Sequence, residues 1–408
     1  MAETYEGYRY HAHTPRCQMR YFSAQYIFTS TGPPIKRGII TASDDGTIIN
    51  IEDTGGNLPE KHSVEFYNGI IVPGFVNCHC HLELSFLRNE IEMKTGLGLF
   101  LMNVNATRND PGYEIEKSIR EADSEMYRDG IVLCADICNS PTTFALKNSS
   151  RIRYISLLEV YGIDPEKAEK RFSEIRELSR IADDYNIQWE IVPHALYSIS
   201  LPLLTLIREA TRFNRISSLH FLESADEIIF LKDHKGPIMD SYSRFLSPVS
   251  QIRTVRDHVS AVLNELNSPA NLILVHNTFI EREQVRQLNE RKNLYYCLCP
   301  NSNLFIEDSL PPADLLRQER CKIVIGTDSL SSNNKLSIFG EIMTLSSHFP
   351  DIPLTDLVSW ATANGAEALC EDSYGTIEPG KKPGLLLIKD ADLVNLKLKP
   401  ESTVERLI

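Results

Sequence analysis

The fold is decided by the stretch Gly69-Ile-Ile-Val-Pro-Gly-Phe-Val-Asn-Cys-His-Cys-His-Leu-Glu-Leu-Ser-Phe-Leu-Arg88. Its β-branched and aromatic residues, interrupted by a Pro-Gly pair, predict a strand that carries His79 and His81 two positions apart. Because side chains alternate between the faces of a strand, both imidazoles point the same way and can share one cation. Cys78 and Cys80 would then point to the opposite face, and their spacing is too short for a Cys₂His₂ zinc site.

Composition indicates an ordinary globular protein. The chain has 408 residues, 42% hydrophobic and 24% charged, which is enough for one large barrel and a smaller domain. A formal net charge of -13, without any block of Lys and Arg, argues against nucleic-acid binding. Nine cysteines without framework spacing predict reduced thiols in a cytoplasmic protein. We expect no signal peptide and no membrane span, because the sequence contains neither type of apolar run.

Both ends of the chain carry short β-type runs separated by turns. Near the start, runs cover residues 21–28, 38–41 and 44–51, and Asp45-Gly46 is a hairpin signal. Near the end, a turn over 375–380 precedes runs at 385–388 and 393–398. These patterns predict a small β-sandwich domain built from residues 1–71 and 371–408.

Residues 72–370 alternate apolar β-type runs with helical segments, which predicts βα units around a parallel sheet. After the opening strand, seven more runs cover 130–137, 153–160, 188–194, 218–222, 272–276, 294–299 and 322–326. Asp164-Pro165 begins a helix whose apolar residues recur at helical spacing from Ala168 to Ile181. The fold class is therefore α/β, a (β/α)₈ TIM barrel, although strand counting leaves an open doubly wound sheet as an alternative. Residues 232–258 form a longer excursion, a candidate lid.

Polar residues end several of these strands. They are His79 and His81 on the first strand, His194 on the fourth, His220 on the fifth, His276 on the sixth and Asp328 after the eighth. A single histidine on an apolar strand is usually a packing residue. A barrel, however, places its active site at the carboxyl ends of its strands, so the whole set indicates a site. By contrast, His11 and His13 follow no apolar strand and are not expected to be ligands.

Three histidines and one carboxylate suit Zn²⁺, and also Fe²⁺ or Mn²⁺. An open coordination position would hold a water, whose pKa the metal lowers so that it becomes a nucleophile. Glu223, three residues after His220, could carry a proton from that water to a substrate nitrogen.

The chain resembles the amidohydrolase superfamily, and within it the metal-dependent aminohydrolases, which include nucleoside-type deaminases and chlorohydrolase-like enzymes. The matching stretches are Pro-Gly-Phe-Val-Asn-Cys-His-Cys-His, Pro-His-Ala-Leu-Tyr-Ser, His-Phe-Leu-Glu-Ser, Val-His-Asn-Thr, Cys-Pro-Asn-Ser-Asn and Gly-Thr-Asp-Ser-Leu-Ser-Ser-Asn-Asn. The closing stretches Thr-Ala-Asn-Gly-Ala-Glu-Ala-Leu and Gly-Thr-Ile-Glu-Pro-Gly-Lys also match. The resemblance runs in the family's order from about residue 20 to 390, and together the stretches are highly specific.

The resemblance implies a role for each residue of the set. The ligands of a single metal would be His79, His81, His220 and Asp328. Glu223 would be the proton shuttle, His276 would orient the attacking water, and Asp328 would also help to deprotonate it. His194 resembles a substrate-contacting histidine. The segment after His81 departs from the better-known nucleoside deaminases, so Glu83 and Arg88 either bind a ribose hydroxyl or an acidic tail, or pair locally. Ser329 is expected at the rim of the pocket.

The sequence thus predicts a metal-dependent hydrolytic deaminase of an adenosine-like amine, such as adenosine, S-adenosylhomocysteine or aminofutalosine. Metal-bound hydroxide would attack the ring carbon while Glu223 protonates the ring nitrogen. The alternatives are hydrolysis of another C–N or C–Cl bond at the same mononuclear site, and an inactive metal-binding barrel. Expected partners are a small-molecule substrate and water, without nucleic acid or membrane, and a homodimer is compatible with the sequence.

Overall fold

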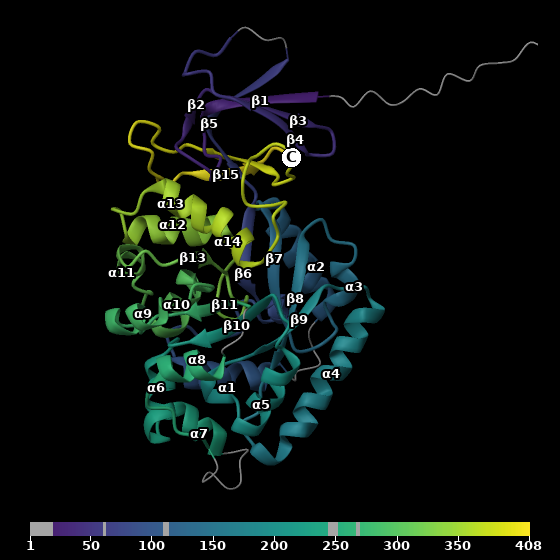
Figure 1. Cartoon of the computed structure of the whole chain (residues 1–408), viewed down its shortest axis with the longest axis vertical. Coiled ribbons are helices and arrows are strands. Elements are labelled where there is room, and N and C mark those ends of the chain that lie inside the picture. The colour runs from purple at the N-terminus through teal and green to yellow at the C-terminus, as the bar shows by residue number, and fades with distance from the viewer. Residues whose placement is uncertain (1–18, 60–62, 109–113, 244–251, 267–269) are drawn as a thin grey trace, which may run out of the picture.

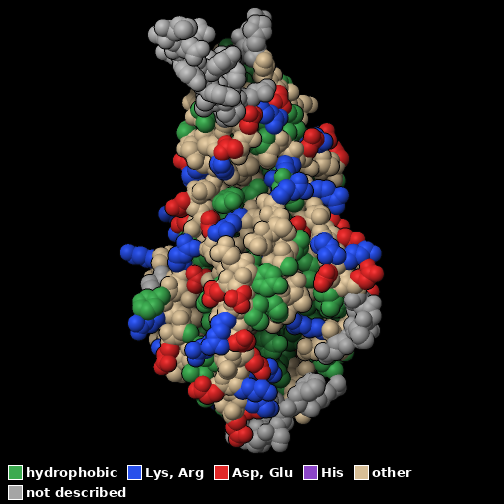
Figure 2. Space-filling view, turned by 90° about the vertical axis from the view of Figure 1, so that its right-hand side faces the viewer, with side chains coloured by type: hydrophobic (Ala, Val, Ile, Leu, Met, Phe, Trp, Pro, Cys, Tyr) green, Lys and Arg blue, Asp and Glu red, His purple; other side chains and the backbone are tan. Residues whose placement is uncertain are grey.

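The computed structural model describes residues 19–59, 63–108, 114–243, 252–266 and 270–408. His11, His13 and part of the predicted excursion lie outside these residues. Figure 1 shows the strands from both ends of the chain gathered at one end of the molecule, beyond a larger body of strands and helices. Figure 2 shows acidic and basic side chains interspersed over one face of the molecule.

Strands from both ends of the chain form one seven-stranded sheet. Its strands are β1 (Met19–Ile27), β2 (Ile35–Lys36), β3 (Ile39–Ser43), β4 (Ile48–Glu52), β5 (Val64–Pro73), β14 (Leu385–Lys389) and β15 (Thr403–Arg406). β5 pairs with β1 in parallel on one side and with β14 antiparallel on the other. Because β5 is paired on both edges, strands from both ends of the chain are joined by continuous hydrogen bonding. The predicted hairpin at Asp45-Gly46 is confirmed, since it connects β3 to β4. The domain boundaries after residues 71 and 370 stay a prediction.

Eight parallel strands build the larger body. They are β6 (Phe75–Cys80), β7 (Ile131–Cys138), β8 (Arg153–Val160), β9 (Trp189–Pro193), β10 (Ile216–Phe221), β11 (Asn271–His276), β12 (Leu294–Leu298) and β13 (Ile323–Ile325). Hydrogen bonds order them in two halves, β6 to β9 and β10 to β13. Parallel bridges between Cys80 and Asp328 and between Ala195 and His220 join the halves at both edges. The strands therefore form a ring, and the predicted α/β barrel is confirmed.

Helices follow the barrel strands, and the last three come after β13. They are α1 (Leu97–Thr107), α2 (Ile115–Arg128), α3 (Phe144–Lys147), α4 (Ala168–Asp184), α5 (Leu201–Ala210), α6 (Ala225–Asp233), α7 (Pro237–Ser243), α8 (His258–Glu265), α9 (Arg282–Leu288), α10 (Pro300–Glu307), α11 (Ala313–Gln318), α12 (Ile338–His348), α13 (Leu354–Trp360) and α14 (Ala363–Ala368). Short 3₁₀ turns cover Leu82–Leu87, Pro165–Lys167 and Leu196–Ser198. Asp164 caps the second of these turns, just before α4, by accepting a hydrogen bond from the Glu166 amide. Within the described ranges, no helix has the length and apolar character needed to cross a bilayer.

Strand β6 departs from regular alternation. Its pairing register with β7 shifts between Asn77 and Cys80, as at a β-bulge. Cys78 packs with Leu133 and other residues in one apolar cluster, whereas Cys80 belongs to another. The expectation that Cys78 and Cys80 share a face was therefore wrong, because an irregularity in a strand breaks its two-residue period. Among the described cysteines none forms a disulfide.

Candidate metal and catalytic site

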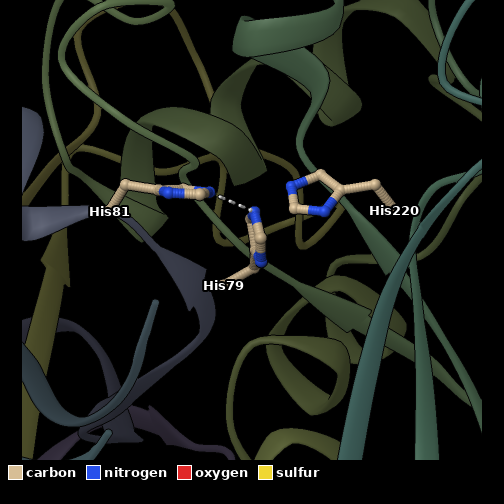
Figure 3. A group of neighbouring side chains, drawn as sticks. All are labelled: His79, His81 and His220. Carbon is tan, nitrogen blue, oxygen red and sulfur yellow. Dashed lines mark hydrogen bonds between the residues drawn. The ribbon is translucent and has the colours of Figure 1, made fainter. Parts of the chain in front are cut away.

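Three imidazoles converge where the two halves of the barrel meet. The Nε2 atoms of His79 and His81 lie 3.1 Å apart, and the rings of His79 and His220 are 4.8 Å apart between centroids. One ring nitrogen from each of the three lies within 4.8 Å of the others. Figure 3 shows the rings turned toward a common centre, with His79 and His81 on one side and His220 on the other. The bulge in β6 thus leaves the predicted convergence of His79 and His81 intact.

Asp328 joins this group from the end of β13. Its Oδ1 lies 3.8 Å from His79 Nε2 and 3.5 Å from His81 Nε2. Its backbone has a φ of 56°, and its amide donates to the His79 carbonyl over 3.0 Å. Its Oδ2 accepts hydrogen bonds of 2.6 Å from both Ser302 and Ser332. The two serines hold one carboxylate oxygen, so the other oxygen faces the imidazoles.

The charges of this group suit a divalent cation. Burial lowers the pKa of His79 well below its usual value and that of His81 to about 3. Burial acts to raise the pKa of Asp328, but the neighbouring His81 and His276 and the serine hydrogen bonds outweigh it and lower this pKa to about 2. Metal ligands must be neutral imidazoles and ionised carboxylates, and these residues take those forms at neutral pH. Three nitrogens and one carboxylate oxygen fit a single metal ion.

Glu223 and His276 face each other beside the proposed ligands. His276 Nε2 lies 3.5 Å from Glu223 Oε1, and both side chains are buried. Burial, followed by the charge of Asp328, raises the pKa of Glu223 well above its usual value. The backbone amide of Glu223 donates to Glu227 over 2.9 Å, which fixes the start of this turn. A protonated carboxyl group at this position can donate a proton.

A cavity of about 210 Å³ opens over these groups. His194 and Ser329, both predicted substrate contacts, line it together with His81, His220, Glu223, His276 and Asp328. One face of α1 contributes Leu97, Phe100, Leu101, Val104 and Asn105 to the wall. From α7, which lies in the predicted excursion, come Ile238, Ser241 and Tyr242. The cavity therefore has a polar floor at the strand ends and a mainly apolar cover of helices.

The other two predicted substrate contacts take different positions. Glu83 is buried and accepts a hydrogen bond of 2.6 Å from Arg108, which lines the cavity. Glu83 also accepts a hydrogen bond from the Ser140 hydroxyl over 2.9 Å. Arg88 instead forms a two-armed pair with Glu125 on α2. The structure thus brings Glu83 next to the cavity through Arg108, and it does not bring Arg88 there.

Several residues of the site were missed in the sequence. Glu159 lines the cavity, and its Oε1 lies 3.7 Å from His220 Nδ1. That oxygen has no hydrogen-bond partner in the described ranges. It is the second-to-last residue of β8, so the rule that singled out the histidines at strand ends would have found it. Ser302 and Ser332, which hold Asp328, follow their strands by several residues. Both lie inside matching stretches, Cys-Pro-Asn-Ser-Asn and Gly-Thr-Asp-Ser-Leu-Ser-Ser-Asn-Asn, which did not by themselves reveal their contact with Asp328.

Comparison with known proteins identifies similar chains. The model of the amidohydrolase family matches residues 70–405. A Helicobacter pylori adenosine deaminase is 26% identical over 345 residues, which cover 80% of each chain. A 5-methylthioadenosine/S-adenosylhomocysteine deaminase from Pyrococcus abyssi is 24% identical over 339 residues, 77% of this chain and 72% of that protein.

Solved structures share the fold. Helicobacter pylori aminofutalosine deaminase in complex with methylthio-coformycin has a TM-score of 0.77 at 22% identity and covers 95% of this chain and 100% of its own. An adenosine deaminase from Xanthomonas campestris with bound zinc has a TM-score of 0.65 at 22% identity, with 93% and 86% covered. At 22% sequence identity, the similarity to these structures supports a shared fold and nothing further.

Proposed function

The chain belongs to the amidohydrolase family, and from this premise we propose that it is a metal-dependent deaminase that releases ammonia from an adenosine-like substrate. The two similar proteins compared above, an adenosine deaminase and a 5-methylthioadenosine/S-adenosylhomocysteine deaminase, are both named for substrates that contain adenosine. The observation that carries the proposal is the close approach of a candidate metal-ligand group to a buried carboxyl group, Glu223, inside one cavity.

One metal ion per chain would be held by His79, His81, His220 and Asp328. We propose zinc, because a nitrogen-rich set of four ligands suits it and the Xanthomonas campestris protein has bound zinc. When bound, such an ion supplies Lewis-acid activation of water at neutral pH. The fit rests on neutral imidazoles that converge on an ionised carboxylate.

Residues of the chain move the protons. Asp328 Oδ1 remains ionised at neutral pH, accepts a proton from the attacking water and returns it to the departing amino group, which leaves as ammonia when its bond to the ring carbon breaks. Glu223, whose pKa is raised, donates a proton to the ring nitrogen next to the reacting carbon. His194 and Ser329, on the cavity wall, contact the substrate. The covering helices exclude bulk water, which strengthens these interactions. The free thiols favour a cytoplasmic location.

An ammonia-release assay tests the proposal. Purified protein is incubated with adenosine, 5′-methylthioadenosine, S-adenosylhomocysteine and aminofutalosine, and its metal content is measured in parallel. We expect ammonia from at least one of them, loss of that activity after chelation and its return with Zn²⁺. Release of chloride from a chlorinated triazine, or of a ring-opened acid, without any ammonia from the nucleosides would contradict deamination and favour the other hydrolase.

A further inference from the structure

Asn303 lies behind His276, on the side of the ring away from Glu223. It is part of α10 and is 1% exposed. Its Nδ2 lies 3.2 Å from His276 Nδ1 and 2.8 Å from Thr278 Oγ1. The two hydrogens of the amide group therefore have two acceptors, one on each neighbour.

The surroundings of Asn303 decide which way its amide faces. Its Oδ1 is buried and has no hydrogen-bond partner among the residues that the structure describes. If the oxygen and nitrogen were exchanged, a group with two N–H donors would occupy the position that offers no acceptor. Buried donors without partners are rarer than acceptors without partners, because their desolvation is not compensated. The nitrogen therefore faces His276.

We propose that Asn303 is a positioning residue that fixes the tautomer of His276, with the ring proton on Nε2. An amide nitrogen can only donate, so Nδ1 must accept, and a neutral imidazole that accepts at Nδ1 carries its hydrogen at Nε2. Asn303 achieves this without contact with substrate, and Thr278 holds the amide in the required orientation.

The tautomer determines what His276 can do in the cavity. Its Nε2 faces Glu223 Oε1 at 3.5 Å and, within the described part of the chain, has no hydrogen-bond partner. As an N–H group it donates a hydrogen bond to an oxygen, and it has no lone pair with which to take a proton. In the proposed deamination, His276 would stabilise negative charge on the reacting oxygen, and this role rests on the proposed function. Proton transfer would be left to the carboxyl groups of Asp328 and Glu223.

Nitrogen NMR tests the tautomer directly. The metal-free protein is labelled with ¹⁵N in its histidine rings, and two-bond N–H correlations distinguish the two neutral forms. We expect His276 in the wild-type protein to be protonated at Nε2. Asn303→Asp keeps the shape of the side chain but presents an acceptor, so the proton should move to Nδ1. Asn301→Ala, on the same helix, is the matched control because Asn301 contacts Thr344, and it should leave the His276 pattern unchanged.

Two results would overturn the proposal: a wild-type His276 protonated at Nδ1, or an Asn303→Asp protein with the wild-type pattern. With an active substrate, Asn303→Asp should lower kcat by on the order of 10²-fold and change KM little, because the lost interaction acts on developing charge. The signals of His194, whose Nδ1 bonds Ser198, are an internal control. The spectra decide the tautomer whether or not any nucleoside is deaminated, so this proposal and the proposed function can fail separately.

Discussion

Replacing Ser302 and Ser332 with alanine should weaken metal binding without removing any ligand. Both hydroxyls lie 2.6 Å from Asp328 Oδ2. A hydrogen bond to a charged group contributes about 1.5–3 kcal/mol. Because both bonds also exist without metal, only the share of this energy that orients Oδ1 counts toward binding, and a share of about 1.4 kcal/mol would raise the dissociation constant of the metal tenfold. This agrees with the roughly 10–100-fold effect of groups that orient metal ligands.

The assay is competition for Zn²⁺ with a chromogenic chelator, applied to Ser302→Ala, Ser332→Ala and the double variant. The two serine oxygens are 2.9 Å apart, so each hydroxyl could turn toward the other, and the losses need not add. Ser218→Ala is the matched control, because Ser218 is similarly buried on β10 and its hydroxyl bonds to none of the described residues. If the double variant binds Zn²⁺ within about twofold of the wild-type protein, the serines do not hold Asp328 as a ligand.

Three further substitutions have definite outcomes. Glu223→Gln should lower kcat by about 10²–10⁴-fold at unchanged zinc content, measured by ammonia release and metal analysis. Lys147→Met should lower the free energy of unfolding by about 3–5 kcal/mol in urea titrations. Asp136 is fully buried 2.5 Å from Lys147 Nζ, and the substitution leaves its charge without a partner. Adding Asp136→Asn should restore part of the loss. Burial raises the pKa of Glu227 from 4.5 to about 8. The folded protein thus binds more protons than the unfolded chain in this range, and stability should fall as pH rises through it, by at most about 1.4 kcal/mol per unit. Glu227→Gln should remove this contribution to the pH dependence of the free energy of unfolding. If the variant and the wild-type protein show the same pH dependence, Glu227 does not contribute to it.

Periodicity was sufficient to predict the barrel. Buried parallel strands appear as short continuous apolar runs, and the eight observed strands begin and end within about two residues of most predicted runs. The histidines were recognised because their positions at strand ends follow from the same runs. The alternation of Cys78 and Cys80 was not predictable, because the register shift in β6 depends on pairing with β7 and leaves no mark in composition.

Contacts between distant segments explain the remaining differences. Arg88 was a reasonable candidate from its place after His81, but its partner Glu125 is on a helix whose docking a sequence pattern does not reveal. Asn303 and Ser302, both on α10, reach the site through hydrogen bonds to His276 at the end of β11 and to Asp328 after β13. Glu159 is different, since its position near the end of β8 follows from the sequence, and a rule that includes carboxylates as well as histidines at strand ends predicts it.

The sheet that joins β1, β5 and β14 has a consequence for the order of folding. The whole barrel lies between β5 and β14 in the sequence, so one edge of β5 has no partner until the barrel segment has been synthesised. Contacts of such long sequence separation form slowly, and an unpaired strand edge can recruit another chain in the meantime. Slower synthesis or lower temperature during expression should therefore increase the yield of folded protein more than added zinc does.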